Sequence, residues 1–406
     1  MRPLYRLGVG AYHLGVRLAA ATGNAPARKW LAGRELPWPV IDYGRPLVWL
    51  HAASLGEFEQ GRPVLAGLRR DHPGHFFLVT FFSPSGYERC RTTELADAVA
   101  YLPRDTPATA RRWVAHLRPA LAIFVKYEFW WHHLAALRDA GCPTYLIAGS
   151  FRPTQPFFRP WGRGYRRVLD CFTKLIVQTA GDRDLLRSVG IPAARIAVGG
   201  DPRMDRTVAL AEAPFRDDLL AAFTAGHPTL LAGSVWPPDV DVIAGATRPP
   251  GWRLVLAPHQ LHEAEIRAWA ARLGAVRYSA LAPGDQVTSD VLILDTIGIL
   301  SRAYRYATLA YVGGAFRTGL HNTLEPLAYG LPVVFGPKFH KFPEAGLALR
   351  RGGAFTVTTA AELSKIWARA QEQRFLTEAR RAQLDLRSEL AGSAERTLAE
   401  ITVPDH

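Results

Sequence analysis

Cysteine is scarce in this sequence, and its spacing argues against two kinds of site. The chain has 406 residues and three cysteines, Cys90, Cys142 and Cys171, each standing alone. None has the paired spacing of a zinc site or of a disulfide framework. We expect reduced thiols in a hydrophobic core, as in cytoplasmic proteins.

Long uninterrupted hydrophobic runs are also missing. The N-terminal stretch is apolar but too short for the run of about 20 residues that spans a bilayer. The side chains that interrupt it are Arg6, His13 and Arg17. No convincing small-residue cleavage site ends it. Two interpretations stay open, a helix packed on the first domain or a helix in the bilayer interface. In the second, lipid head groups face the basic residues Arg28, Lys29 and Arg34.

Acidic residues are in the minority. Lys and Arg number 49 against 36 Asp and Glu, which gives a net charge of +13. This excess favours a nucleic acid, an anionic membrane surface or a phosphorylated substrate as partner, although a general bias towards arginine is the alternative. No nucleic-acid-binding module accompanies the charge, so we expect no nucleic acid partner.

Length and composition indicate a globular protein with more than one core. With 48% hydrophobic and 21% charged residues, the 406-residue chain exceeds one ordinary domain. Short β-rich runs alternate with helical stretches. The first series of runs covers 46–53, 75–82, 121–128, 144–150 and 174–180, and the second covers 229–234, 252–258, 291–295, 309–314 and 331–337. Helical spacing is evident at 57–71, 108–118 and 261–274.

Two series of parallel βα units predict an α/β fold with two doubly wound, Rossmann-like domains facing one another across a cleft. The break falls in a stretch rich in Gly, Pro and charge at 199–218. We therefore expect a membrane-associating segment at 1–35, a first domain at 36–205 and a second domain at 215–406. Ligands of such sheets bind outside the carboxyl ends of the strands, so we expect the site in the cleft.

The stretch HAASLGEFE places a carboxylate where a helix follows a buried strand. Small residues let a substrate approach the backbone, and the helix macrodipole stabilises Glu57 as a carboxylate by about 0.3–1 kcal/mol. A general base that removes a hydroxyl proton needs such a carboxylate. The alternative is that Glu57 only stabilises the helix start. Glu59 points away from such a site.

Two other turns after predicted strands carry titratable groups. VKYEFWW puts Glu128 among aromatic side chains, where it could act as an acid, position a sugar ring or only cap a helix. APHQLHEAE carries His259 and His262, but no third ligand lies at a metal-binding spacing. We expect no metal there.

The stretch GGAFRTGLHNTLEP matches a capping box, with Asn322 bonding into the first helical turn and Glu325 reaching back. The free amides of a helix start can also bind phosphate, while Glu325 accepts hydrogen bonds from a ribose diol. Three glycines would let a nucleotide approach the backbone: Gly313, Gly314 and Gly319. Two side chains line the site without an assigned role: Arg317 and His321.

Eight stretches in this order resemble the 3-deoxy-D-manno-octulosonic acid (Kdo) transferases: HAASLGE, VTFFSPSGYER, YLPRDTP, KYEFW, VGGDPRMD, AGSVWPPD, LDTIGIL and YVGGAF…GLHNTLEPLAYGLPVVFGP. They run from about residue 48 to 345, which is most of the chain. The resemblance implies an inverting GT-B glycosyltransferase of lipopolysaccharide core biosynthesis that uses no metal or other cofactor. It also implies transfer of Kdo from CMP-Kdo to a lipid A precursor, lipid IV-A, at the cytoplasmic face of the inner membrane.

The resemblance further implies roles for individual residues. Glu57 matches the catalytic base, and Glu128 and Arg203 match positions that stabilise the transition state. The positions that match CMP-binding segments are Pro258, His259, Ile297, Gly298, Ile299, Asn322, Thr323, Leu324 and Glu325. The implied partners are CMP-Kdo, a lipid A precursor and an anionic membrane surface.

The sequence also departs from the family pattern. Arg203 stands where Lys is common, and Ile299 stands where Glu is common, so a side-chain contact to the nucleotide is missing there. GLHNTLE replaces GGHNPLE, and KYEFW replaces ETELW. Two other functions stay open: a GT-B transferase that uses a UDP-sugar on another lipid-linked acceptor, and a non-catalytic basic protein at the membrane surface.

Overall fold

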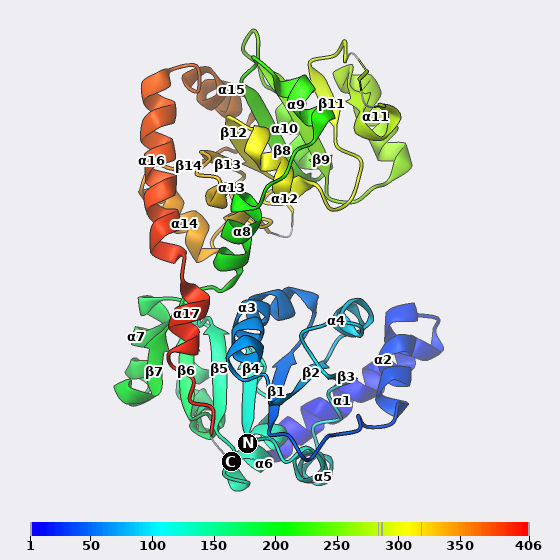
Figure 1. Ribbon diagram of the computed structural model, residues 1–406, viewed down its shortest axis with the longest axis vertical. Helices are drawn as coiled ribbons and strands as arrows, with labels where there is room; N and C mark the ends of the chain where they lie inside the picture. Colours follow the sequence, from blue (N-terminus) through cyan, green and yellow to red (C-terminus); the bar gives the residue numbers. More distant parts are fainter. Residues whose placement is uncertain (1, 283, 286, 318, 405–406) are drawn as a thin grey trace. The chain divides into compact units, whose positions relative to one another are not determined.

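The computed structural model describes residues 2–282, 284–285, 287–317 and 319–404. The chain forms two compact units (Figure 1). The first unit extends to Arg203 and includes the chain again from Gly392, whereas the second unit is Met204–Ala391. The prediction of two doubly wound α/β domains is confirmed by the sheet of each unit.

The sheet of the first unit, within the described chain, has seven parallel strands in the order β3-β2-β1-β4-β5-β6-β7. The strands are β1 (Leu47–Ala52), β2 (Phe76–Phe81), β3 (Ala98–Tyr101), β4 (Leu121–Val125), β5 (Thr144–Gly149), β6 (Lys174–Val177) and β7 (Ile196–Val198). The helices are α1 (Arg2–Ala21), α2 (Ala25–Glu35), α3 (Leu55–Asp71), α4 (Pro84–Cys90), α5 (Pro107–Leu117), α6 (Trp131–Asp139), α7 (Ala180–Ser188) and α17 (Ser393–Leu398). Short 3₁₀ turns cover Pro156–Phe158, Pro160–Gly164, Arg166–Cys171 and Ala193–Arg195.

The sheet of the first unit is buried on both faces. Along β1, Trp49 packs into one hydrophobic cluster, and its neighbours Val48 and Leu50 pack into the other. Side chains alternate between the faces of a strand, so a strand covered by helices on both sides is apolar throughout. This explains why the central strands appear in the sequence as continuous apolar runs.

The second unit repeats this architecture. Its described residues form a sheet of seven parallel strands in the order β10-β11-β9-β8-β12-β13-β14. The strands are β8 (Thr229–Val235), β9 (Arg253–Pro258), β10 (Val276–Arg277), β11 (Val291–Ile293), β12 (Leu309–Val312), β13 (Val333–Phe335) and β14 (Ala354–Thr356). The helices are α8 (Arg203–Glu212), α9 (Asp218–Thr224), α10 (Pro237–Gly245), α11 (Glu263–Leu273), α12 (Leu300–Ala303), α13 (Leu324–Ala328), α14 (Pro343–Arg350), α15 (Ala360–Arg369) and α16 (Gln373–Leu390). Two 3₁₀ turns are Tyr278–Ala280 and Tyr304–Tyr306.

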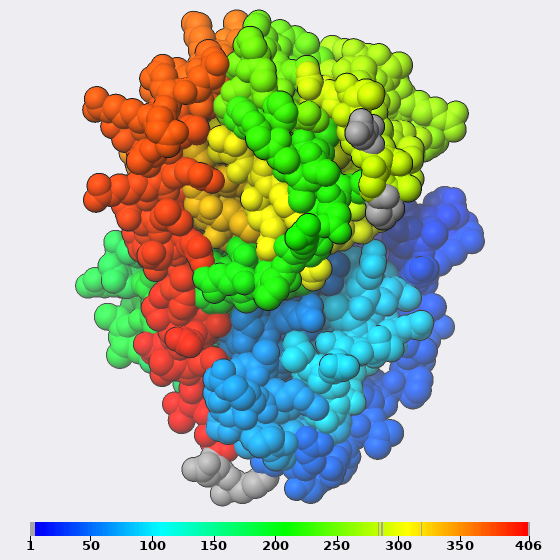
Figure 2. All heavy atoms as spheres, turned by 45° about the horizontal axis from the view of Figure 1, so that its top comes forward, coloured from blue at the N-terminus to red at the C-terminus, as the bar shows by residue number. Residues whose placement is uncertain are grey.

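The C-terminal end of the second domain differs from the sequence prediction. From Gly392 the chain returns to the first unit and runs over its surface (Figures 1 and 2). Ala394 is buried in the hydrophobic cluster of β1 and β2, and Lys174 Nζ lies 2.5 Å from Glu400 Oε2. These contacts join segments far apart in sequence, so no local pattern in the C-terminal helix indicates them.

The N-terminal segment forms two helices, α1 and α2, of which one side packs on the first unit. Tyr5 donates a hydrogen bond of 2.5 Å to Asp105, and the Trp30 side chain is buried beside Phe82. The opposite side of α1 is exposed and apolar. No helix of the described residues is long and apolar enough to cross a bilayer.

Candidate active site

The first unit carries two carboxylates where its strand order reverses. β1 and β4 are neighbours, and the chain leaves them towards opposite edges of the sheet. Such a reversal opens a crevice outside the carboxyl ends of the two strands. Glu57 follows β1 on α3, and Glu128 follows β4 in a loop. The structure thus brings both predicted residues to the same edge of the sheet.

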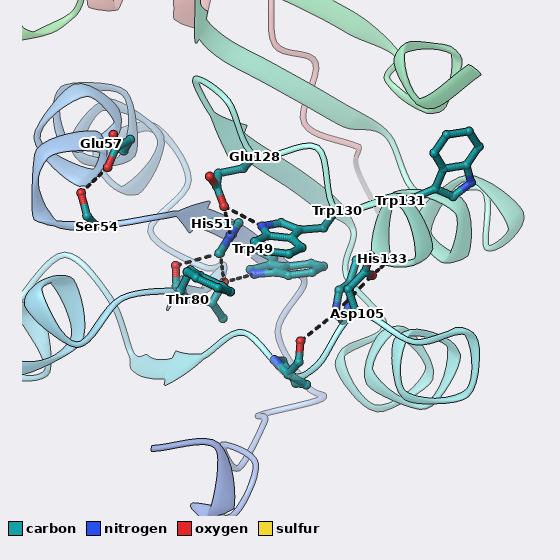
Figure 3. Close-up of polar contacts among 12 residues, drawn as sticks. Trp49, His51, Ser54, Glu57, Thr80, Asp105, Glu128, Trp130, Trp131 and His133 are labelled. Atoms are coloured by element: carbon teal, nitrogen blue, oxygen red, sulfur yellow. Dashed lines mark hydrogen bonds and ion pairs between the residues drawn. The ribbon is translucent and has the colours of Figure 1, made fainter. Parts of the chain in front are cut away.

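Glu57 lies in the first turn of α3. The helix begins at Leu55 after the N-cap residue Ser54, so the helix macrodipole favours a carboxylate at position 57. The Ser54 hydroxyl donates a hydrogen bond to Glu57 Oε2 (Figure 3). Glu57 is half-buried. The rival carboxylate Glu59 instead pairs with Arg62, with Oε1 3.5 Å from Nη1.

Glu128 is held by two ring N–H groups. Its Oε2 accepts hydrogen bonds from His51 Nε2 at 2.9 Å and from Trp130 Nε1 at 2.6 Å (Figure 3). The residue is 8% exposed, and no described residue hydrogen-bonds to Oε1. One carboxylate oxygen is therefore fixed, and the other can accept a hydrogen bond from a ligand. The alternative that Glu128 caps α6 is wrong, because the first-turn amides of His132 and His133 donate to Asp105 instead.

His51, which the sequence did not single out, orients Glu128. It is completely buried at the end of β1, and its Nδ1 lies 2.9 Å from Thr80 Oγ1. Thr80 Oγ1 accepts a hydrogen bond of 2.8 Å from Trp49 Nε1, and His51 Nδ1 also lies 3.1 Å from the Thr80 carbonyl oxygen. A continuous chain of hydrogen bonds then runs from Trp49 to Glu128. The signal that could have identified His51 in the sequence is a polar residue at the end of an otherwise apolar strand.

Arg203 is locked by a carboxylate. Its guanidinium donates to both oxygens of Asp201, with Nη2 2.6 Å from Oδ2. Gln60 and Gln178 donate to the same Oδ2 at 3.1 and 3.2 Å. Burial opposes ionisation of Asp201, but the charge and hydrogen bonds of Arg203 outweigh it and lower the pKa of Asp201. Gln60 lies one helical turn after Glu57, so this ion pair lies on the same side of the sheet as Glu57.

The predicted nucleotide-binding residues of the second unit follow three strands. Pro258 ends β9 and His259 comes next, residues 297–299 lie beyond β11, and residues 322–325 lie beyond β12. In the sheet order β11-β9-β8-β12 these strands surround β8, so all the segments lie at one edge. Ile297 is 84% exposed and Gly298 has a φ of 97°. These residues form an open turn before α12.

A stack of rings lies at this edge. Trp236 stacks on His259, with ring centroids 4.6 Å apart, and His259 stacks on His321 at 4.1 Å. Trp236 Nε1 donates a hydrogen bond of 2.8 Å to His321 Nε2, and the Arg317 guanidinium lies 4.4 Å from the Trp236 ring centroid. Burial and the neighbouring His259 lower the pKa of His321 to about 4, and burial lowers the pKa of His259. Both imidazoles are thus neutral near pH 7.

Trp236 and Asp239 were missed as individual residues, although the AGSVWPPD stretch contains both. Asp239 is buried, and its Oδ2 accepts hydrogen bonds of 2.9 Å from the amides of Trp236 and Gly314. Its Oδ1 accepts one of 2.9 Å from the Tyr311 hydroxyl. Asp239 therefore fixes the turn after β12 against the start of α10. Burial raises the pKa of Asp239.

The glycines after β12 also have a structural reason. A Cβ at Gly313 would lie 2.4 Å from the backbone oxygen of Ser234, and one at Gly314 would lie 2.5 Å from that of Gly319. The protein's own backbone therefore requires these two glycines, whether or not a nucleotide binds. Beside Gly319 a Cβ would meet only Phe342, at 3.9 Å.

The predicted capping box is wrong in its register. Helix α13 begins at Leu324, and its N-cap residue is Thr323, which makes no side-chain cap. Asn322 Oδ1 does accept a hydrogen bond of 3.2 Å from the Leu324 amide, as predicted. Glu325 accepts one of 3.2 Å from the Asn322 side-chain amide and does not reach back to the backbone. Burial raises the pKa of Glu325, against the opposing effects of Asn322 and Arg206.

Within the described part of the chain, three of the four non-glycine residues with a positive φ lie at or near the carboxyl ends of strands. They are Lys126 with φ 65°, Ala148 with 51° and Ser234 with 54°. Left-handed backbone is uncommon for residues with a side chain and concentrates at functional sites. Among the residues that the structure describes, no group of three or more His, Cys, Asp or Glu is placed to hold a metal ion.

Comparison with known proteins gives a consistent family. A family model described as 3-deoxy-D-manno-octulosonic-acid transferase (kdotransferase) matches residues 22–206. A 3-deoxy-D-manno-octulosonic acid transferase of Bordetella pertussis is 31% identical over 405 residues, which cover 92% of this chain and 90% of that protein. A relative of the same name from Chlamydia muridarum is 29% identical and covers 74% of this chain and 73% of its own.

Solved structures show the fold. A UDP-GlcNAc 2-epimerase from Neisseria meningitidis, bound to UDP-GlcNAc, matches with a TM-score of 0.63. The match covers 87% of this chain and 99% of that one at 11% identity. The GT-B type predicted for the fold is thereby confirmed. The sequence relationships go further: the chain belongs to the 3-deoxy-D-manno-octulosonic-acid transferase (Kdotransferase) family, and it is a glycosyltransferase.

Proposed function

We propose that the chain transfers Kdo from CMP-Kdo to a lipid A precursor such as lipid IV-A, with inversion and without a metal. The observation that carries the proposal is the pair of carboxylates, Glu57 and Glu128, at the reversal of strand order in the first unit. A transferase of this kind needs a base for the acceptor hydroxyl and a group that orients the reacting atoms.

Glu57 takes the role of the base. Its carboxylate, at the start of α3 beside the Ser54 hydroxyl, accepts the proton as the acceptor oxygen attacks the anomeric carbon. The bond from that carbon to the phosphate oxygen of CMP breaks in the same step. The departing CMP takes the electron pair, and the configuration at the carbon inverts.

Glu128 and Arg203 act as supporting groups. Glu128 offers Oε1 to the substrate while His51 and Trp130 hold Oε2. Arg203 carries positive charge that stabilises the negative charge developing on the leaving phosphate. The ion pair with Asp201 fixes the orientation of the Arg203 guanidinium.

The second unit supplies the nucleotide site. The neutral rings of Trp236, His259 and His321 offer flat faces and hydrogen-bonding edges to a base and ribose. Asn322 and Glu325 add polar groups beside them. Residues 297–299 form the third segment. Ile299 has no polar side chain, so its contribution is limited to the backbone and to apolar contact.

The exposed face of α1 suits attachment to the membrane. Leu7, Leu14 and Leu18 are 69%, 59% and 61% exposed, and Ala11 is exposed between them. Their spacing places them on one helix face. Arg17, Arg28 and Lys29 are exposed nearby, whereas Arg34, expected beside them, is half-buried. An apolar stripe with basic neighbours binds an anionic bilayer, such as the cytoplasmic leaflet of the inner membrane.

Nucleotide binding tests the donor. A ligand present at 100 times its dissociation constant stabilises the folded state by about 2.7 kcal/mol. We expect CMP to raise the melting temperature and UDP at the same concentration to leave it nearly unchanged. Incubation with CMP-Kdo and lipid IV-A, followed by mass spectrometry, should show acceptor heavier by one or more Kdo residues. A UDP-specific shift together with an unmodified acceptor would refute the proposal.

A further inference from the structure

The first unit has two apolar pockets beneath α1 that the transfer chemistry does not use. One has a volume of about 330 Å³ and is lined mainly by Tyr5, Val9, Leu102 and Trp130. The other has a volume of about 510 Å³ and is lined mainly by Val16, Ala19, Pro26 and Trp30. Tyr12 and Phe82, whose ring centroids lie 5.8 Å apart, line both pockets, and we call these two adjoining pockets together the α1 groove.

Charge at the α1 groove is positive. Arg34 and Arg104 line the first pocket, and neither pairs with a carboxylate in the described chain; Arg34 Nη1 and Nη2 each donate one hydrogen bond to a backbone carbonyl, of Trp30 and Phe82. The Arg34 guanidinium lies 3.4 Å from the Trp30 ring centroid, and burial lowers the pKa of Arg34 to about 9. Burial and the charges of Arg104, Arg34 and Arg17 lower the pKa of His13 to about 4. Both pKa shifts are expected where water is partly excluded and the neighbouring charges are positive.

The one carboxylate in the lining does not offset this charge towards a ligand. Asp105 is buried, and it accepts hydrogen bonds from the Tyr5 hydroxyl and from the amides of His132 and His133. Both of its oxygens are therefore engaged. The groove offers long apolar walls and two guanidinium groups, which is the chemistry that binds an acyl chain attached to a phosphate-bearing head.

The α1 groove is also connected to the catalytic carboxylates. Trp130 lines the first pocket and donates the 2.6 Å hydrogen bond to Glu128. Phe82, which lines both pockets, stacks on Trp130 with ring centroids 4.8 Å apart. A chain seated in the groove would therefore leave its polar head beside Glu128.

We propose that the α1 groove binds an acyl chain of the lipid acceptor and that Arg34 and Arg104 bind its phosphate. This inference rests on the proposed function and adds to it how the acceptor is selected. It predicts that the enzyme prefers an acylated acceptor because of the groove, independently of attachment to a membrane.

Substitution of glycines on α1 can place new side chains in the α1 groove. Gly8 lines the first pocket and Gly15 the second, and a Cβ at either position meets no atom within 4 Å. Gly8→Leu and Gly15→Leu thus add side chains without a backbone clash. The matched control is Gly10→Leu, because Gly10 has the same free space on the same helix and lines neither pocket.

The decisive measurement compares kcat/KM for lipid IV-A with kcat/KM for its deacylated product, both in detergent solution. Each buried methylene that a new Leu displaces costs about fourfold in affinity, so Gly8→Leu and Gly15→Leu should lower this ratio by about tenfold or more. Gly10→Leu should keep the wild-type ratio. An unchanged ratio in both groove variants, or an equal fall in Gly10→Leu, would overturn the proposal.

Two further experiments distinguish the ways in which the proposal could be wrong. Arg104→Gln should weaken the binding of lipid IV-A more than the binding of its dephosphorylated form. Arg111→Gln, which removes the same charge outside the groove, should not have this effect. Binding of lipid IV-A without CMP-Kdo should weaken in the groove variants even if no transfer occurs, so a failure of the proposed function is distinguishable. If the variants lose only phosphatidylglycerol vesicle binding and keep the acceptor ratio, the groove binds membrane lipid and the proposal is wrong.

Discussion

Glu128 illustrates how single residues around the site depend on one another. Its carboxylate keeps one orientation only because His51 and Trp130 both donate to Oε2. His51 in turn is oriented by Thr80 and Trp49. A hydrogen bond to a charged group contributes about 1.5–3 kcal/mol, so loss of His51 leaves the carboxylate held by Trp130 alone and Thr80 in contact with Trp49 alone.

We predict that His51→Ala lowers kcat by about tenfold to a hundredfold, which corresponds to the loss of one charge-assisted hydrogen bond. The KM for CMP-Kdo should stay near the wild-type value, because His51 lies in the first unit and orients Glu128 only. His51→Gln, which keeps a donor, should recover part of kcat. A larger effect on KM than on kcat would contradict the positioning role.

His321 gives the second unit a pH dependence of stability. Its pKa of about 4 in the folded protein lies below the ordinary value of 6.5, so the unfolded state binds more protons below pH 6.5. His259, whose ring stacks on His321, opposes protonation of His321 together with burial. We predict that the melting temperature falls as the pH drops from 6.5 to 4.

Scanning calorimetry over that pH range measures the effect. Each 1 kcal/mol moves the melting temperature of a domain this size by about 2–4 °C, so a change of a few degrees is expected. His321→Gln should make the decline shallower, whereas His262→Gln, at an exposed position of the same unit, should not. An identical decline in His321→Gln and wild type would contradict the account.

At the level of elements, the sequence predicted the central strands and missed the edges. All ten predicted strands exist, from β1 to β13. The four that were missed are β3, β7, β10 and β14, which are the two edges of each sheet. They are only two to four residues long and half-buried in part, so they lack the apolar run of a strand covered on both faces. Edge strands are short for the further reason that a long exposed edge invites pairing with other chains.

The sequence likewise predicted only part of the candidate active site. The order of strands and the turns that follow them predicted where Glu57 and Glu128 lie, because parallel strands place these turns at one edge. The ring stack of Trp236, His259 and His321 could not be predicted, since it joins the ends of three strands. The start of α13 was misplaced by one residue, because Asn322 fits the local capping pattern but accepts from Leu324 instead.

Helix α1 has two apolar sides with different surroundings, and the exposed side can be tested alone. Leu7, Leu14 and Leu18 do not line the α1 groove. Burying one leucine contributes about 1.5 kcal/mol or more, so Leu14→Glu should weaken binding to phosphatidylglycerol vesicles by at least about tenfold. Leu261→Glu, at an exposed leucine of the second unit, is the control. Co-sedimentation that shows equal binding by both variants would refute attachment through this stripe.

At the scale of the whole molecule, the two units have the same kind of sheet and different tasks. The first carries the carboxylates and the N-terminal helices, and the second carries the ring stack. The net charge of +13 fits phosphorylated and membrane-bound partners. The second unit begins at Met204 and the chain returns to the first unit at Gly392, a return that depends on contacts with distant segments.

The central claim is that Glu57 is the base, and transfer by Glu57→Gln tests it most directly. General base catalysis contributes about 10²- to 10⁴-fold, so initial rates of Kdo transfer to lipid IV-A should fall by that factor. Binding of CMP should stay within about twofold of wild type, since Glu57 and the nucleotide site belong to different units. Glu59→Gln should keep most of the activity. Near wild-type transfer by Glu57→Gln, with CMP binding retained, would contradict the account.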